Sequence, residues 1–356
     1  MTEPSLTGKL IAWLADLVRG FGLPEPLIQV LGWIVGCLAV VIAILTTVIF
    51  LIYVERKISA WIQVRIGPNR VGPYGLLQTV MDALKLMLKE DIMPAACDKG
   101  LFVAAPLLVF ATAVVTLCVV PWDRDASGGE LSIGLLFISS VASLTVIGIM
   151  MAGWASNNKW SLLGGLRSAA QMVSYEIPQA LALISVVVWT GTLSMREIGL
   201  GQSGWFFEWN LFKYWLWAPA LVYFIASIAE VNRTPFDLPE AESELVSGFN
   251  TEYTGMKFAC FFVGEFASMF LVSLVFSALF LGAWNTGVPA LDRVIPGPIV
   301  MYTKAWVIIL VMMWVRWTLP RLRVDQLMGF AWKLLIPAGI VSIVIVGFVI
   351  SVGLTY

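Results

Sequence analysis

Eight apolar blocks of about 20 residues each dominate the sequence and constrain its fold more than any other feature. A helix of about 20 apolar residues spans the roughly 30 Å hydrocarbon core of a bilayer. The blocks cover approximately residues 28–54, 101–120, 133–154, 169–191, 214–229, 258–283, 301–319 and 334–354, and the fifth is the shortest. Because backbone polar groups must be satisfied inside each spanning segment, this pattern predicts an all-α polytopic membrane protein with about eight transmembrane helices.

The composition supports this class, since 59% of the residues are hydrophobic and only 13% are charged, against about 25% charged residues in soluble domains. A soluble dehydrogenase, a nucleic-acid-binding protein and a secreted disulfide scaffold are excluded. The chain has no histidine, and its four cysteines (Cys37, Cys97, Cys118 and Cys260) lie far apart. We therefore expect no metal site, His-ligated haem, Ser-His-Asp triad or iron–sulfur cluster on this chain alone.

The chain is predicted to form one domain preceded by a short amphipathic segment. Residues 1–25 mix Lys9, Asp16 and Arg19 with apolar residues, which is typical of an interfacial helix rather than a cleaved signal peptide. No low-complexity linker divides residues 26–356, so we expect a single transmembrane domain there. No internal repeat is evident, which disfavours an inverted-repeat transporter.

The basic residues predict the orientation in the membrane. The loops after the first, third, fifth and seventh blocks, with their flanks, hold 15 of the 22 lysines and arginines. Because cytoplasmic loops of membrane proteins are enriched in Lys and Arg, we expect these loops on the cytoplasmic side of a bacterial inner membrane. Both termini would then lie on the opposite side.

The loop after the first block combines charge with a rigid turn. It begins with Glu55, Arg56 and Lys57 and continues through a stretch rich in Gly and Pro at residues 65–75, which predicts a fixed turn. Residues 76–90 then carry apolar residues at helical spacing, with Asp82 on another face, and predict an amphipathic interfacial helix. The alternative is an ordinary basic juxtamembrane anchor.

The loop after the fifth block, residues 230–253, is dominated by carboxylates and holds one arginine, Arg233. Acids at the start of a solvated helix would be one explanation. However, Glu240 and Glu244 would then repel each other at i,i+4, and the interleaved apolar residues such as Phe236 would have no purpose. The loop therefore indicates a functional acidic cluster.

Three acids lie within or at the end of apolar blocks. Glu176 is in the fourth block, Glu265 is in the sixth, and Glu230 closes the fifth. An ionised carboxylate at mid-span costs roughly 2.5–3.5 kcal/mol, so such residues usually face a protein interior or a water path. Glu176 and Glu265 are both on the order of 12–14 Å from the cytoplasmic end at 1.5 Å per residue. This indicates a proton path from the cytoplasm, although each could instead be a neutral structural acid.

Five motifs in this sequence resemble one known family. They are ERK at 55–57, RIGPNRVGPYGLLQ at 65–78, SYEIP at 174–178, AEVNRTPFDLPEAESELVSGFNTEY at 229–253 and RWTLPRLRVDQLM at 316–328. Together they are similar to the H subunit of NADH-quinone oxidoreductase, respiratory complex I, from about residue 28 to the C-terminus. Residues 1–25 and 203–212 carry no motif of that family.

The resemblance implies a membrane protein that joins the membrane arm of the complex to the peripheral arm and contributes to the quinone chamber. It implies partners among the cluster-bearing peripheral subunits and the membrane-arm subunits, with quinone as substrate, iron–sulfur clusters and FMN on partner chains, and no independent catalysis by the isolated chain. Residues implied at the quinone chamber and its entrance are Glu55, Arg56, Arg65, Arg233, Phe236 and Asp237. Residues implied in the acidic relay to proton translocation are Asp82, Glu176, Glu230, Glu240, Glu242, Glu244, Glu252 and Glu265.

Two alternatives remain open at this point. The chain could be the equivalent subunit of a ferredoxin- or coenzyme F420-linked dehydrogenase or of a membrane-bound hydrogenase, since the electron-donor module lies on other chains. The complete acidic loop favours the quinone enzyme. The other alternative is a secondary transporter that exchanges protons for a cation through the same acids.

Overall fold

The computed structural model describes residues 24–124, 131–213, 215–238, 246–289, 291–292 and 294–353, and within these ranges every regular element is helical. The long elements are α2 (Glu25–Ile62), α4 (Lys99–Val119), α5 (Gly134–Ala155), α6 (Lys159–Thr190), α10 (Gly255–Phe280), α11 (Gly297–Thr318) and the continuous run of α12 (Val324–Phe330), a π-helical turn (Ala331–Leu335) and α13 (Ile336–Ser351). The shorter elements are α3 (Gln78–Leu88), α7 (Met195–Leu200), α8 (Trp217–Glu230) and 3-10 turns at Pro73–Gly75, Phe206–Glu208, Asn210–Phe212 and Gly248–Asn250.

The prediction of an all-α polytopic membrane protein is confirmed, with one difference in the count of long spans. Seven helices among the described residues are long and apolar enough to cross a membrane. The fifth apolar block forms only α8, whose 14 residues extend about 21 Å at 1.5 Å per residue. The helix begins three residues after the start of the predicted block and ends at Glu230, close to the predicted end. The chain then turns at Asn232, which adopts a left-handed conformation with a φ of 52°.

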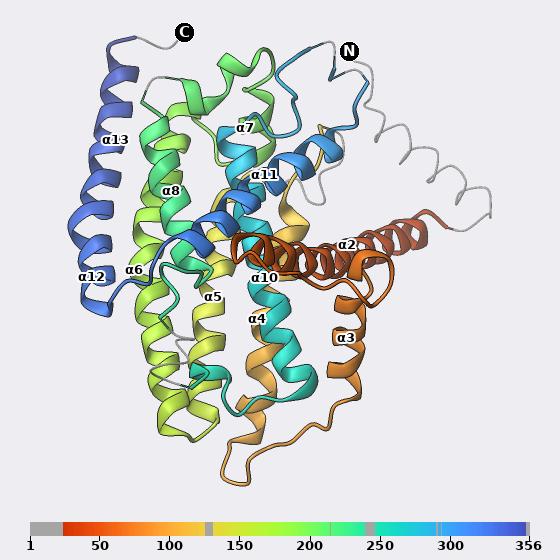
Figure 1. Ribbon diagram of the computed structural model, residues 1–356. Coiled ribbons are helices and arrows are strands. Elements are labelled where there is room, and N and C mark those ends of the chain that lie inside the picture. Colours follow the sequence, from red (N-terminus) through yellow and green to blue (C-terminus); the bar gives the residue numbers. More distant parts are fainter. Residues whose placement is uncertain are drawn as a thin grey trace.

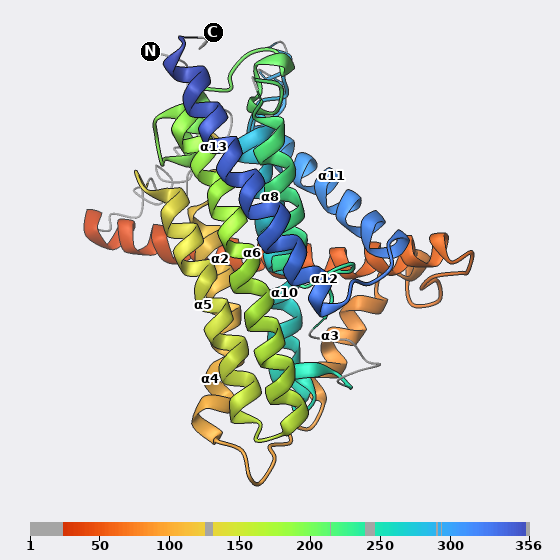
Figure 2. The same ribbon diagram turned by 90° about the vertical axis from the view of Figure 1, so that its left-hand side faces the viewer.

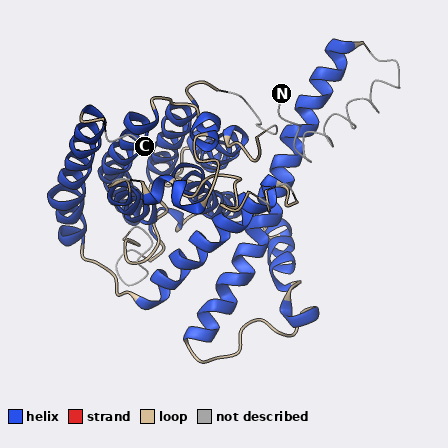
Figure 3. Ribbon diagram, turned by 90° about the horizontal axis from the view of Figure 1, so that it is seen from above, coloured by secondary structure: helices blue, strands red, loops and turns tan. Residues whose placement is uncertain are grey.

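The first long helix differs from the expectation that a loop begins at Glu55. Instead, α2 continues to Ile62, and Glu55 lies within it with its side chain buried. In Figures 1 and 2, α2 crosses the other long helices at a steep angle, and in Figure 3 its N-terminal half projects away from them. Among the described side chains of α2, the buried ones that pack into the core, such as Ile44, Val48 and Leu51, lie in its C-terminal half.

The helix ends follow local sequence signals. The side chain of Asn158 accepts a hydrogen bond from the backbone nitrogen of Trp160 at 3.0 Å and so begins α6, as expected of an N-cap residue. Gly191, in the left-handed conformation with a φ of 72°, ends α6. Asp98 caps α4 in the same way as Asn158 caps α6, through the nitrogen of Gly100 at 3.2 Å.

The core lies around α10, which is the most enclosed of the long helices. It packs against α4, α8 and α11, and α6 packs against α5, α8 and α13. Side chains such as Tyr175, Tyr223, Phe266 and Phe280 fill the space between these helices. The amphipathic segment predicted for residues 76–90 is helical as α3 and packs against α2 and α10. The predicted segment 1–25 lies almost entirely outside the described residues.

Candidate functional site

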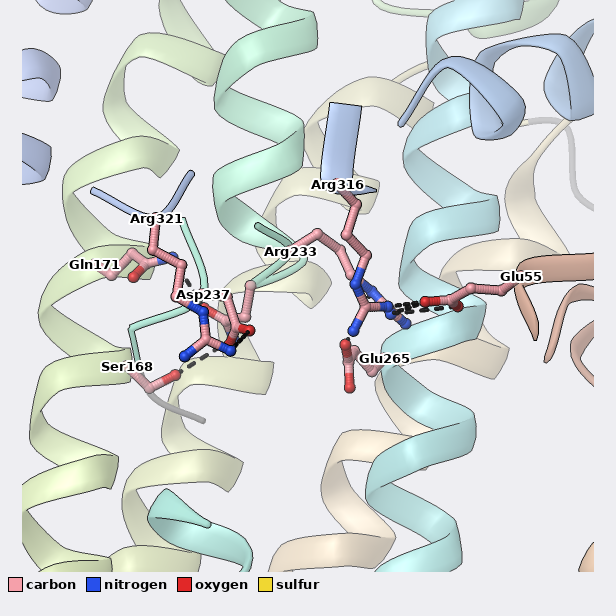
Figure 4. A network of polar contacts seen from close by, with 9 residues as sticks. Glu55, Ser168, Gln171, Arg233, Asp237, Glu265, Arg316 and Arg321 are labelled. Atoms are coloured by element: carbon pink, nitrogen blue, oxygen red, sulfur yellow. Dashed lines mark hydrogen bonds and ion pairs between the residues drawn. The ribbon is translucent and has the colours of Figure 1, made fainter. Parts of the chain in front are cut away.

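A chain of four charged side chains links α11, α2, the turn after α8, and α10 (Figure 4). Arg233 is at its centre and is only 4% exposed. Its NH1 atom lies 3.2 Å from Oε1 of Glu55, and its Nε atom lies 3.0 Å from Oε1 of Glu265. Arg316 also pairs with Glu55. The order Arg316–Glu55–Arg233–Glu265 alternates positive and negative groups, so the charges of these partly buried side chains balance. We call these four residues the ionic chain.

The position of Arg233 follows from the local fold. Its backbone nitrogen donates to the carbonyl of Ile228 at 3.2 Å, which closes the turn that ends α8. Its guanidinium carbon lies 4.3 Å from the centre of the Phe266 ring, a favourable cation–π distance. A buried guanidinium needs such partners because an isolated buried charge is costly.

A second group of contacts holds the following segment against α6. The amide nitrogen of Gln171 donates to the carbonyls of Ala229 at 2.8 Å and Phe236 at 2.6 Å, and to Oδ1 of Asn232 at 3.1 Å. Next along the chain, Asp237 pairs with Arg321 at 3.1 Å. The ring of Phe236 lies between Tyr175 and Phe330. Residues 229–237 are therefore fixed by neutral and charged side chains from several elements.

Two cavities inside the bundle connect the membrane acids. The first, of about 60 Å³, is lined by Glu230 and Glu265 together with hydroxyl groups such as that of Thr116. The second, of about 220 Å³, is lined by Glu176 and Glu230. Glu176 accepts a hydrogen bond from Ser143. The structure therefore brings Glu265 and Glu230 to one cavity and Glu230 and Glu176 to the next, and a cavity with several polar groups on its wall can hold water. We call these three acids and the two cavities the cavity route.

The other predicted site residues lie apart from this route. Asp82 pairs with Arg56 between α3 and α2, and the amide of Gln78 donates to it at 3.1 Å. Arg65 is exposed beyond the end of α2, and its Nε atom donates to Gln63 at 2.6 Å.

Glu252 lies beside the start of α6, where Asn158 donates to it at 2.7 Å. The neighbouring residue, Tyr253, stacks on Phe102 with ring centres 4.1 Å apart, and burial raises the pKa of its hydroxyl. Glu240, Glu242 and Glu244 lie outside the described residues.

Several residues of the site were not assigned a role from the sequence. Arg316 and Arg321 belong to a motif that carried the family resemblance, and their charge could have suggested acidic partners. The pairing of each with one particular carboxylate depends on tertiary packing. Gln171 and Ser143 are neutral and stand in apolar blocks, so they gave no comparable signal.

Comparison with known proteins identifies the family. The family model described as NADH dehydrogenase matches residues 35–347. The NADH-quinone oxidoreductase H subunit of Chlorobium luteolum is 46% identical, over 96% of this chain and 95% of that protein. The H subunits of Brevibacillus brevis (46% identical; 90% and 94% covered) and Rhodospirillum centenum (42% identical; 93% and 96% covered) are similar over comparable lengths. The chain belongs to the family of NADH-quinone oxidoreductase H subunits.

Membership of this family agrees with the resemblance found in the sequence motifs. The family model begins within α2 and ends within α13, so it includes all four members of the ionic chain and all three acids of the cavity route. Among the described residues, no group of three or more His, Cys, Asp and Glu side chains could hold a metal ion.

Proposed function

We propose that this protein, as a membrane subunit of a proton-pumping NADH-quinone oxidoreductase, lines the quinone chamber. A change in the charge of the quinone would then alter the protonation of buried carboxylates in this subunit. The observation that carries the proposal is the chain Arg316–Glu55–Arg233–Glu265. Two of its members, Glu55 and Arg233, are among the residues predicted for the quinone chamber. The last member, Glu265, lines the first of the two cavities.

The chemistry of quinone reduction explains why such a chain would be useful. A quinone that accepts two electrons becomes a dianion, which requires protons and nearby positive charge. A negative charge near the guanidinium groups would compete with Glu55 and Glu265 for Arg233. The weakened pairing would leave the negative charge of Glu265 without its counter-ion and so favour proton uptake by this side chain. The electrons would come from an iron–sulfur cluster on a partner chain.

The proton would then move through the cavity route. Glu265 and Glu230 line the first cavity, and Glu230 and Glu176 line the second. Carboxylates that share a small polar space titrate as a coupled group. Water in these cavities would exchange protons among the three acids and carry them toward the proton-pumping subunits.

The apolar tail of the quinone needs a separate path from the bilayer. The exposed face of α3 carries Met81, Leu84 and Leu88, and α2 lies beside it. We place the quinone entrance between these two helices, with the Arg56–Asp82 pair at its polar border. The basic residues favour an orientation with this region toward the cytoplasm of a bacterial cell.

The test is Arg233→Lys in the assembled complex. Lysine keeps the charge but loses the planar fork that contacts two carboxylates. A hydrogen bond to a charged group contributes about 1.5–3 kcal/mol, so quinone reduction should fall about 10-fold or more, while reduction of an artificial acceptor upstream continues.

The matched control for this test is Arg196→Lys. Arg196 donates from Nε to the carbonyl of Arg124 at 2.9 Å, away from the ionic chain. Unchanged quinone reduction in Arg233→Lys would refute the proposed role. Purification in mild detergent would also separate this function from the ferredoxin-, F420- and hydrogenase-linked alternatives, through the donor module that comes with the chain.

A further inference from the structure

The segment that leads from α7 into the first residue of α8, residues 205–217, is unusually aromatic and has no part in the proposed function. Its described aromatic residues are Trp205, Phe206, Phe207, Trp209, Phe212, Trp215 and Trp217. We call it the aromatic segment. It lies at the end of the bundle where α10 ends, opposite the 3-10 turn Gly248–Asn250, where α10 begins (Figures 1 and 2).

Most of these rings face outward, and their ring contacts form two groups. Trp205, Phe207, Phe212, Trp215 and Trp217 are between 53% and 68% exposed. The ring centres of Phe206 and Phe207 are 3.9 Å apart, and Phe212 lies 6.3 Å and 6.4 Å from them. Trp215 and Trp217 are 6.0 Å apart. Contiguous exposed apolar surface usually marks a binding surface for a partner or a membrane.

The aromatic segment is held firmly by buried amides. The amide nitrogen of Gln202 donates to the carbonyl of Ala278 at 3.0 Å, and its oxygen accepts from the backbone nitrogen of Asn210 at 3.1 Å. The amide of Asn210 donates to the carbonyl of Leu279 at 2.8 Å. Carbonyls in the last turn of a helix have no partner within the helix, so these side chains cap α10 and fix the aromatic segment to it.

One ring faces inward and completes this attachment. Trp209 lies under the ammonium group of Lys304, 4.2 Å from the ring centre. Lys304 also donates to the carbonyl of Ala283 at 3.0 Å. Gly282, with a φ of 76°, lies so close to the Trp209 indole that a Cβ atom there would be 2.4 Å from Nε1. The aromatic segment therefore presents its other rings on a rigid support.

We infer that the aromatic segment is an interfacial anchor that binds the phospholipid headgroup layer at the end of the bundle opposite the start of α10. Trp side chains are enriched at membrane interfaces because they combine an apolar body with a polar N–H group. The 14 residues of α8 reach only about 21 Å, against a hydrocarbon core of about 30 Å. A helix of this length cannot reach both boundaries of the core, and we place the end that carries Trp215 and Trp217 at one of them.

The charges within the aromatic segment favour lipid over a protein partner. Glu208 and Lys213 stand between the rings, and Glu208 is exposed. Lys and Glu are depleted from the centres of protein interfaces. A headgroup layer, in contrast, accommodates both charge signs next to apolar rings.

The test places the photoreactive residue p-benzoylphenylalanine at position 207 or 215 of the complete complex in native membranes. After irradiation, mass spectrometry of this chain should show an increase of one phospholipid at both positions. The matched control is the same residue at position 209, where the inward-facing ring should give no lipid adduct. A cross-link to another protein of the complex at position 207 or 215 would overturn the inference. So would the lack of any adduct at these positions, which would indicate a surface in contact with water.

Discussion

The Nε atom of Arg233 lies 3.0 Å from Oε1 of Glu265. This ion pair joins the loop that follows α8 to the N-terminal half of α10. The same guanidinium group contacts Glu55 on α2 through NH1. One cation thus serves two carboxylates on two helices. A change in the charge of either carboxylate must alter the pairing of the other.

Replacement of the acids of the cavity route should distinguish proton transfer from a structural role. Glu265→Gln and Glu176→Gln keep the shape and most hydrogen bonds but remove the exchangeable proton, so proton pumping linked to quinone reduction should be lost while the complex assembles. Glu265→Asp and Glu176→Asp keep the acid and should retain more pumping than the Gln variants, because proton transfer through water tolerates a shift of the carboxyl group by about one methylene, roughly 1.5 Å. Wild-type pumping in both Gln variants would identify neutral structural acids.

Because Glu55 pairs with two arginines, we expect the effects of Glu55→Gln and Arg316→Met on the melting temperature to be strongly non-additive. Glu55→Gln leaves Arg233 and Arg316 close together and should lower the melting temperature of the complex, since breaking a buried pair costs about 3–5 kcal/mol. Arg316→Met in the Glu55→Gln background should recover part of this loss, because it removes the excess positive charge. Additive effects in this double-mutant cycle would show that Arg316 and Glu55 act independently.

Gln171→Leu should loosen the segment that carries Arg233. The carbonyls of Ala229 and Phe236 and the side chain of Asn232 would each lose one donor. The two carbonyls would keep the backbone nitrogens of Asn232 and Leu238 as donors, so we expect a loss of about 0.5–1.5 kcal/mol for each hydrogen bond removed. Hydrogen exchange of residues 229–238 in the complex should become faster. Gln326→Leu is the matched control, since Gln326 is exposed and caps only α12. Equal exchange in both variants would mean that Gln171 does not hold this segment.

Gly282→Ala should destabilise the far end of the bundle. Gly282 has a φ of 76°, and its missing side chain leaves room for Trp209. A residue with a Cβ atom in this conformation should cost more than about 1 kcal/mol, seen as a lower melting temperature. Gly347→Ala in α13 is the control, because a Cβ atom there meets no other atom within 4 Å. A melting temperature equal to that of the control would contradict this packing.

Cysteine labelling should reveal the orientation. With the native exposed Cys37 replaced by serine, Asn69→Cys should react with an impermeant reagent only after intact cells are opened. Ser203→Cys, at the opposite end of the bundle, should react in intact cells. The reverse pattern would invert the predicted topology.

The sequence was sufficient to predict the helical class and the approximate position of each apolar block, because long apolar runs are visible as a pattern. The role of the acids Glu176, Glu230 and Glu265 stays a prediction, and the structure places all three on the walls of the two cavities. The sequence was not sufficient for the continuation of α2 through Glu55 to Ile62. Inside this helix, Glu55 pairs with Arg233 and Arg316, which come from distant parts of the sequence. The roles of Asp82 and Glu252 came from family resemblance, and the structure separates both from the cavity route.

The position of Glu230 has a consequence for leakage. Among the described residues, it is the only ionisable group on the walls of both cavities. In the proposed route, a proton that crosses from one cavity to the other would therefore have to wait for this carboxyl group to be vacant. Exchange at a single side chain would then limit the whole route, and holding Glu230 protonated would close it in both directions without any movement of a helix.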